Sequence, residues 1–135
     1  MKISAEELME AAERELAQGR RVSVRAHGGS MEPFVREGDV VVLERRERYV
    51  TDDIVLAATD HGVMLHALMP DGRVMGTANV ARRERVVRVA GCAVSVERGG
   101  RVWRTGSRKW RMMMAAWRWG LPVRRVFLKF LKRNF

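Results

Sequence analysis

The stretch GGSMEPF at residues 28–34, followed by GDVVVL at residues 38–43, decides how this chain is interpreted. Two glycines directly before Ser30 allow the backbone to take a tight or left-handed turn. Such a turn can expose the serine hydroxyl while main-chain N–H groups point to the same place, which is the arrangement that a developing oxyanion needs. Pro33 then restricts the direction in which the chain leaves the turn. Because a Gly-Gly-Ser segment alone is usually only a loop, its meaning depends on its surroundings.

The sequence around this turn has the pattern of an antiparallel β-rich domain. Short runs rich in valine, isoleucine and leucine alternate with glycine, proline or aspartate, which is typical of strands joined by turns. We expect strands at residues 22–26, 39–43, 54–58, 63–68, 73–75 and 86–96. The predicted fold is therefore mainly β, with a small, coiled, partly barrel-like antiparallel sheet.

A helix is predicted before the strands, at residues 4–18. Ser4 followed by Glu7 has the spacing of a capping box, and apolar residues then recur at helical spacing at positions 8, 9, 12 and 16. We interpret this segment as an amphipathic helix that packs on the β body. The chain is thus divided into an N-terminal helix at 1–20, a β domain at 21–100 and a C-terminal tail at 101–135.

Composition and charge set further limits. The 135 residues are 47% hydrophobic and 31% charged, which is enough apolar material for a packed core. Residues 1–100 hold 15 Lys/Arg and 16 Asp/Glu, a net charge of −1, whereas residues 101–135 hold 11 Lys/Arg and no acid. The single Cys92 excludes an internal disulfide and a cysteine-built zinc site, and three scattered histidines are a poor basis for a metal site. No metal and no cofactor are therefore expected.

The basic tail is also aromatic, and it indicates a surface-binding role. All four tryptophans lie in it, and GLP at residues 120–122 divides it into two predicted amphipathic helices. The first helix would carry Trp110, Met113, Met114 and Trp117 on one face; the second would carry residues 123, 126, 127, 130 and 131. This design fits an anionic membrane surface. Packing of the first apolar face on the body and binding to nucleic acid are the alternatives, with nucleic acid less favoured.

The sequence gives no sign of a membrane span or an export signal. No apolar run approaches the roughly 20 residues that a spanning helix needs, and residues 1–18 are acidic and helical in pattern. Together with the single cysteine, this predicts a cytoplasmic protein that is peripheral at the membrane.

The Gly-Ser-Met-x-Pro segment, followed by Gly-Asp and a valine-rich strand, resembles the nucleophile box of the signal peptidase and LexA-like serine peptidase superfamily. The resemblance continues in DDIV at residues 52–55, which is similar to the Gly-Asp-Ile-Val strand of that family, and in VMLH at residues 63–66, similar to the strand that carries the general base. VAGCAV at residues 89–94 resembles its closing strand. The base is lysine in bacterial signal peptidases and LexA and histidine in the archaeal and endoplasmic-reticulum type, so His66 implies the histidine variant.

What the resemblance implies is acyl transfer, with Ser30 as nucleophile and His66 as its base. A neutral imidazole can take the serine proton during attack and return it to the leaving amine. The backbone N–H groups of Gly29 and Ser30 would form the oxyanion hole. Met31 and Pro33, next to the nucleophile, would line the substrate pocket. His27 could also reach Ser30, although its position along a strand favours a place beside the site.

The third member of the histidine-type site is missing. The family carries a Gly-Asp element and a further aspartate here, whereas residues 76–84 read GTANVARRE and no aspartate follows Asp71. Glu84 is the candidate orienting acid, and the alternative is a solvated ion-pair partner of the neighbouring arginines. Loss of the acid in a triad typically reduces turnover on the order of 10⁴-fold.

The sequence therefore predicts a signal-peptidase-like serine endopeptidase that cleaves a peptide or precursor protein near a membrane surface through a Ser30/His66 dyad. The alternative is a catalytically degenerate member of the same family that serves as a peptide-binding or membrane-docking accessory protein.

Overall fold

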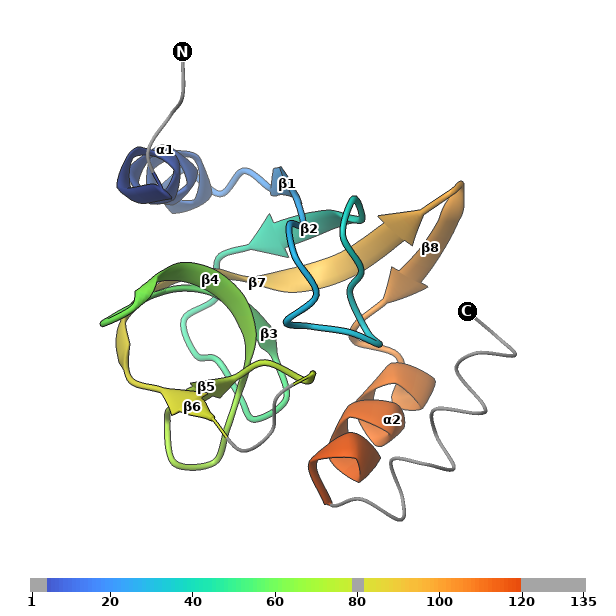
Figure 1. The fold of residues 1–135 in the computed structure, drawn as a ribbon. Coiled ribbons are helices and arrows are strands. Elements are labelled where there is room, and N and C mark those ends of the chain that lie inside the picture. The colour runs from blue at the N-terminus through green and yellow to red at the C-terminus, as the bar shows by residue number, and fades with distance from the viewer. Residues whose placement is uncertain (1–4, 79–81, 120–135) are drawn as a thin grey trace.

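The structure, a computed structural model, describes residues 5–78 and 82–119. Its elements are α1 (Ala5–Ala17), β1 (Val22–Arg25), β2 (Val40–Glu44), β3 (Ile54–Thr59), β4 (Gly62–Leu68), β5 (Val74–Met75), β6 (Arg83–Glu84), β7 (Val86–Arg98), β8 (Arg101–Arg104) and α2 (Arg108–Trp119). All strands join one antiparallel sheet in the order β1-β2-β7-β3-β4-β5-β6, with β8 paired to β7. The sheet curls strongly through β3 and β4 but stays open, since β1 and β6 are its ends (Figure 1). The predicted mainly β, coiled fold is confirmed.

The long strand β7 joins the two halves of the sheet. It pairs with β2 near its C-terminal end and with β3 near its N-terminal end, and both pairings contain register shifts. Such bulges let a strand bend while it stays hydrogen-bonded. One half, β1-β2, leads into the loop that carries Ser30, and the other, β3-β4, carries His66. The curvature of β7 therefore decides how close these two residues come.

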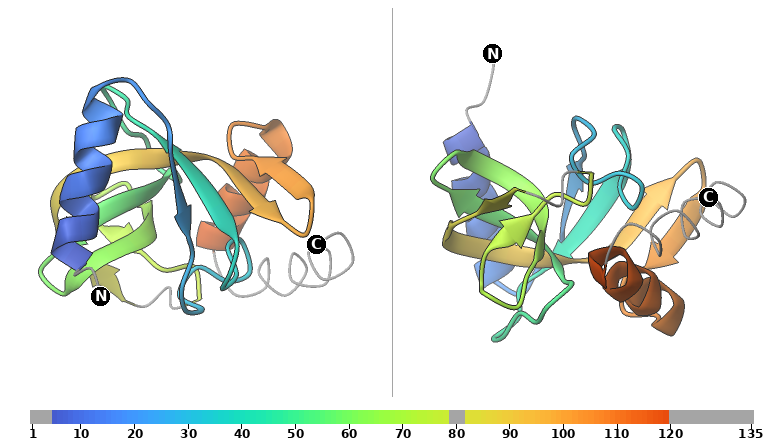
Figure 2. Two further views of the ribbon diagram at one scale, coloured as in Figure 1. Left: turned by 90° about the horizontal axis from the view of Figure 1, so that it is seen from above. Right: turned by 60° about the horizontal axis from the view of Figure 1, so that its bottom comes forward.

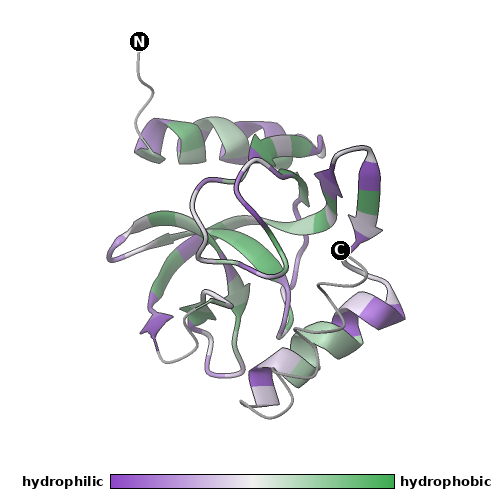
Figure 3. Ribbon diagram, turned by 45° about the vertical axis from the view of Figure 1, so that its right-hand side comes forward, coloured by the Kyte–Doolittle hydropathy of each residue, from purple (hydrophilic) through white to green (hydrophobic). Residues whose placement is uncertain are grey.

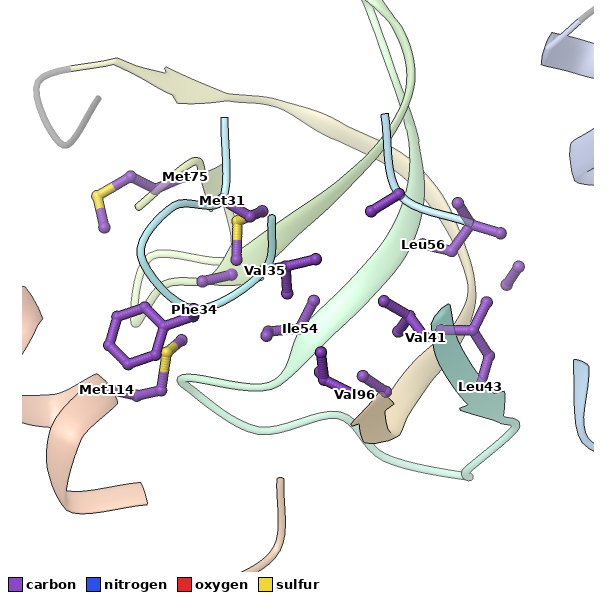
Figure 4. Close-up of a cluster of buried hydrophobic side chains, with 14 of the residues drawn as sticks. Met31, Phe34, Val35, Val41, Leu43, Ile54, Leu56, Met75, Val96 and Met114 are labelled. Atoms are coloured by element: carbon purple, nitrogen blue, oxygen red, sulfur yellow. The ribbon is translucent and has the colours of Figure 1, made fainter. Parts of the chain in front are cut away.

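The residues that follow Ser30 form part of the hydrophobic core. Met31, Phe34 and Val35 are each at most 3% exposed and belong to the same cluster as strand residues such as Ile54 and Val96 (Figure 4). Burying side chains of this size stabilises the fold by about 1.5–3 kcal/mol each. The loop is consequently held by its own side chains, although Ser30 itself is exposed.

The N-terminal helix packs on the body as predicted. Met9, Ala12 and Leu16 of α1 are buried, and the helix contacts β7, β4 and β1. Leu8, expected on the same face, is 46% exposed. The predicted cap at Ser4 lies outside the described residues. In two further views α1 and α2 lie at opposite ends of the sheet (Figure 2).

The first part of the tail is not helical, which corrects the prediction for residues 101–135. Residues 101–104 form β8, because Gly99 and Gly100, with φ of 54° and 81°, make a hairpin turn that pairs this segment with the end of β7. The predicted helix is present as α2, and its shared face is buried against the body. The predicted second helix lies outside the described residues. Neither described helix is long and apolar enough to cross a membrane.

Asp39, at the start of β2, is a structural residue. Its carboxylate is 2% exposed, accepts two hydrogen bonds from Arg98 at 2.8 and 2.7 Å and accepts one from the backbone N–H of Arg36. We predict that Asp39→Ala lowers the free energy of unfolding by about 3 kcal/mol, because Arg98 loses its partner in a mostly buried place. Chemical denaturation would measure this. Glu97→Ala, at an exposed neighbour, should change it by less than about 0.5 kcal/mol, and equal losses would contradict this role.

Candidate active site

The loop after β1 presents Ser30 at the surface. Gly28 has a φ of 77°, in the left-handed region that glycine enters without strain, and a tight turn follows, in which the N–H of Glu32 donates to the carbonyl of Gly29. Within the described residues, neither the N–H of Gly29 nor that of Ser30 donates a backbone hydrogen bond. The oxyanion role of these two N–H groups stays a prediction.

His66 lies on β4, opposite Val55 of β3, with its ring half-buried. Its Nδ1 atom is buried without a hydrogen-bond partner. Burial lowers the pKa of His66 below its usual 6.5, and the negative charge of Glu84 opposes this shift without reversing it. The ring is therefore mostly neutral at pH 7, as a general base must be.

Gly76 is the point at which these two residues meet. A Cβ atom built on Gly76 would lie 2.6 Å from the carbonyl oxygen of Ser30 and 3.2 Å from Nε2 of His66. The next residues strengthen the contact, because the N–H of Ala78 donates to the same Ser30 carbonyl at 3.0 Å. Only a residue without a side chain fits between the loop that carries Ser30, here called the nucleophile loop after the predicted role of Ser30, and the histidine ring. The sequence contained this glycine, but nothing in its pattern indicated such a contact.

Ser30, His66 and Gly76 line one small cavity, together with Arg82 and Glu84. The cavity encloses about 180 Å³. Among the described residues no hydrogen bond joins the Ser30 hydroxyl to His66. Catalytic hydrogen bonds are often long before substrate binds, so this geometry is compatible with a dyad.

Glu84 reaches the cavity but does not hold the His66 ring, which corrects the expectation of an orienting acid. Its buried carboxylate is 2.6 Å from Nδ1 of His61 and 2.9 Å from Nε of Arg82. His61 lies in the turn between β3 and β4 and is exposed, as expected, but that turn brings it to β6. Glu84 therefore influences His66 through its charge.

A second, apolar cavity of about 210 Å³ is also lined by Ser30. Its walls come from α1, the end of β1, the nucleophile loop and β4, and include Leu8, Val24, Met31, Val63 and Leu65. Met31 lines this cavity, and its contact with a substrate stays a prediction. Pro33 is buried and lines neither of the two cavities beside Ser30. His27 lies on the wall of the apolar cavity, beside the site.

The surroundings of Cys92 decide its reactivity. Burial raises the pKa of the Cys92 thiol to about 11, so this buried cysteine is no competing nucleophile at neutral pH. No group of three or more His, Cys, Asp or Glu residues suitable for a metal ion occurs in the part of the chain that the structure describes.

The charge of Glu84 gives a testable pH dependence. Since burial lowers the pKa of His66 below its usual 6.5, the pH at which the acylation rate of Ser30 is half-maximal should lie below 6.5. Glu84→Gln removes the negative charge that raises the pKa of His66. The fall in acylation rate at acidic pH should therefore occur at still lower pH in this variant. Initial rates of covalent labelling of Ser30 by a β-lactone probe, measured between pH 4.5 and 8, would give this pH dependence. Asp71→Asn, at an exposed carboxylate, is the control. A fall in rate that begins at higher pH in Glu84→Gln than in the wild type would contradict the assigned influence of Glu84.

More than half of the chain matches a known protein family. A family model described as Peptidase S24-like matches residues 3–79. The matched region contains Ser30, His66 and Gly76 and ends before Glu84 and α2. A comparison with curated proteins gives no match.

Proposed function

The chain belongs to the Peptidase S24-like family, within the LexA and signal peptidase-like serine peptidases, and from this premise we propose that it is a serine endopeptidase of the signal peptidase type. Ser30 is the nucleophile and His66 is its general base. One observation carries this assignment: the carbonyl of Ser30 and Nε2 of His66 both lie against Gly76 at a single cavity.

The mechanism follows from the positions of the groups. Nε2 of His66 accepts the hydroxyl proton as Oγ of Ser30 forms a bond to the scissile carbonyl carbon, and the N–H groups of Gly29 and Ser30 bind the oxyanion. The C–N bond then breaks, and the imidazolium returns its proton to the leaving amine. Water, deprotonated by His66, finally hydrolyses the acyl-enzyme ester. The apolar cavity favours a substrate with an apolar side chain next to the scissile bond.

Covalent labelling tests the proposal. A fluorescent β-lactone opens its ring on an activated serine hydroxyl and leaves an ester, which peptide mass spectrometry can locate. We expect labelling of Ser30 at pH 7.5 in the wild type and none in Ser30→Ala, while Ser23→Ala, at an exposed serine of β1, is labelled like the wild type. Equal labelling of the wild type and Ser30→Ala would contradict the proposal.

A second candidate function is a catalytically degenerate, peptide-binding accessory protein. It is favoured by Nδ1 of His66, which is buried without a partner while the carboxylate of Glu84 binds His61 and Arg82. An imidazole that is not held in orientation is a weaker base. Unlabelled wild-type protein that still binds apolar peptides, with binding lost when Leu65 at the apolar cavity is changed to aspartate, would support this candidate over the enzyme.

We place the reaction at an anionic membrane surface on the cytoplasmic side, with the chain peripheral to the bilayer. Support comes from the 11 cations without an acid after residue 100 and from Met112 and Trp119, which are 66% and 79% exposed on α2. The buried face of α2 takes no part in this contact, since Trp110 and Trp117 are at most 6% exposed.

Vesicle binding tests the membrane contact. Sedimentation with phosphatidylglycerol vesicles should exceed that with phosphatidylcholine vesicles, should weaken with salt and should fall in Trp119→Ser. Leu8→Ser, at an exposed apolar residue of α1, serves as the matched control. Tight, steeply salt-dependent binding to duplex DNA without vesicle affinity would favour nucleic acid and contradict this placement.

A further inference from the structure

The helix α2 lies outside the residues matched to the family, yet it packs on the loop that carries Ser30. The ring of Phe34 meets Trp110 and Trp117 edge to face, with centroid distances of 5.5 and 5.8 Å. All three side chains are at most 6% exposed. Figure 4 shows the side chains of Phe34 and Met114 close together at this contact. Apolar residues alternate along α2 with hydrophilic ones (Figure 3).

Hydrogen bonds connect the same helix to the segment around Gly76. The indole N–H of Trp117 donates to the carbonyl of Thr77 at 2.7 Å, and the hydroxyl of Thr77 donates to the carbonyl of Glu32 at 2.9 Å. Ala78, next in the chain, donates to the carbonyl of Ser30. Thr77 is 2% exposed. These three bonds lead from α2 through the Gly76 segment to Ser30 itself and to Glu32, two residues after it.

The helix also contacts the part of the sheet that carries His66. Arg111 and Arg118 form ion pairs with Asp53 and Asp52, at 2.7 and 3.1 Å, just before β3. The backbone of this acidic pair is hydrogen-bonded in both directions to Leu68, at the end of β4. Asp52 has a φ of 75°, a conformation unfavourable for a residue other than glycine, and its ion pair offsets part of that cost.

From these contacts we infer that α2 sets the spacing of the proposed dyad, with Trp117 and Thr77 as positioning residues. One face of the helix packs against the nucleophile loop and the Gly76 segment. Its arginines bind the acidic pair directly before β3, the strand that pairs with the His66 strand β4. This inference rests on the proposed function. It assigns to the C-terminal part of the chain a catalytic requirement that the matched family region does not contain.

Matched variants of buried threonines separate positioning from simple stability. Thr77→Val keeps the shape and removes the donor, whereas Thr77→Ser keeps the donor. Thr105→Val removes a comparable buried hydroxyl bond, that of Thr105 to the carbonyl of Ala93, which has no link to Ser30. Trp117→Phe removes the indole donor and keeps an aromatic ring.

The measured quantities are the maximal rate of β-lactone acylation at Ser30 and the half-saturating probe concentration. Thr77→Val and Trp117→Phe should reduce the rate by about 10–100-fold with the half-saturating concentration within about twofold. Thr77→Ser should regain most of the rate, and Thr105→Val should keep it. Thermal unfolding of each variant reports stability separately. Equal rates in Thr77→Val and Thr105→Val, or equally slow Thr77→Val and Thr77→Ser, would overturn the inference.

A readout without turnover separates this inference from the proposed function. Loosening the Gly76 segment lets water reach the His66 ring, so the pKa of His66, measured by NMR titration, should rise toward 6.5 in Thr77→Val and not in Thr105→Val. If the wild type is not labelled but this difference is found, the proposed enzyme fails and the positioning by α2 stands. If the pKa of His66 is the same in both variants, the positioning fails whatever the labelling shows.

Discussion

His66→Ala is expected to slow acylation of Ser30 by at least about 10⁴-fold at pH 7.5, the largest effect that this account predicts. A serine hydroxyl is a weak nucleophile at neutral pH. In the described part of the chain, the cavity that Ser30 shares with Gly76 is lined by one histidine, His66, and by Arg82 and Glu84, which pair with each other. The remaining reaction would depend on the oxyanion hole and on binding alone.

The measurement is the β-lactone labelling rate, with the adduct located by mass spectrometry. His27→Ala serves as the comparison, because it changes a histidine at the apolar cavity that Ser30 also lines, and it should slow labelling by less than about tenfold. Circular dichroism and thermal unfolding show whether each variant is folded. A folded His66→Ala protein that labels Ser30 at the wild-type rate would remove His66 from the mechanism.

Gly76→Ala should produce the second-largest effect, a loss of at least about 100-fold in acylation rate. The added methyl group would lie 2.6 Å from a backbone oxygen of Ser30, a distance that real Cβ atoms do not adopt, so the nucleophile loop and the histidine ring must move apart. Since the φ of Gly76 is not in the left-handed region, the expected effect comes from contact and not from backbone strain.

Gly106→Ala is the matched control, because a Cβ on Gly106 meets nothing within 4 Å. It should keep the wild-type rate. Labelling rates and unfolding temperatures of both variants would be compared. A Gly76→Ala protein that is folded and labels at the rate of Gly106→Ala would show that Ser30 and His66 do not depend on this close contact.

Most of the sheet could be predicted because its strands are apolar runs ended by glycine, proline or aspartate. Strands β1 to β5 and β7 agree with the predictions to within two residues at their ends. The two missed strands are short and charged: β6 has two residues, and β8 reads Arg-Val-Trp-Arg, which looks like the basic tail. Their pairing depends on neighbours in the fold and not on their own composition. Gly99-Gly100 was the signal that could have identified β8.

The candidate site could be predicted only in part. The glycine turn and the resemblance identified Ser30 and His66, which the fold places at one cavity. The ion pair of Glu84 with His61 was not predictable, because it requires the β3-β4 turn to lie beside β6. The contacts of Trp117 with Thr77 and of Arg118 with Asp52 likewise join segments far apart in the sequence. Periodicity identified the buried face of α2 but not what it packs against.

The coupling between the serine and the imidazole can be measured most directly by titrating both in one protein. NMR gives the pKa of the His66 ring, and the rate of β-lactone ester formation at Ser30 gives the pH at which acylation is half-maximal. If His66 is the base, the two midpoints coincide below pH 6.5, and the rate midpoint disappears in His66→Ala. An acylation rate that stays constant while the ring of His66 takes up its proton would contradict the account.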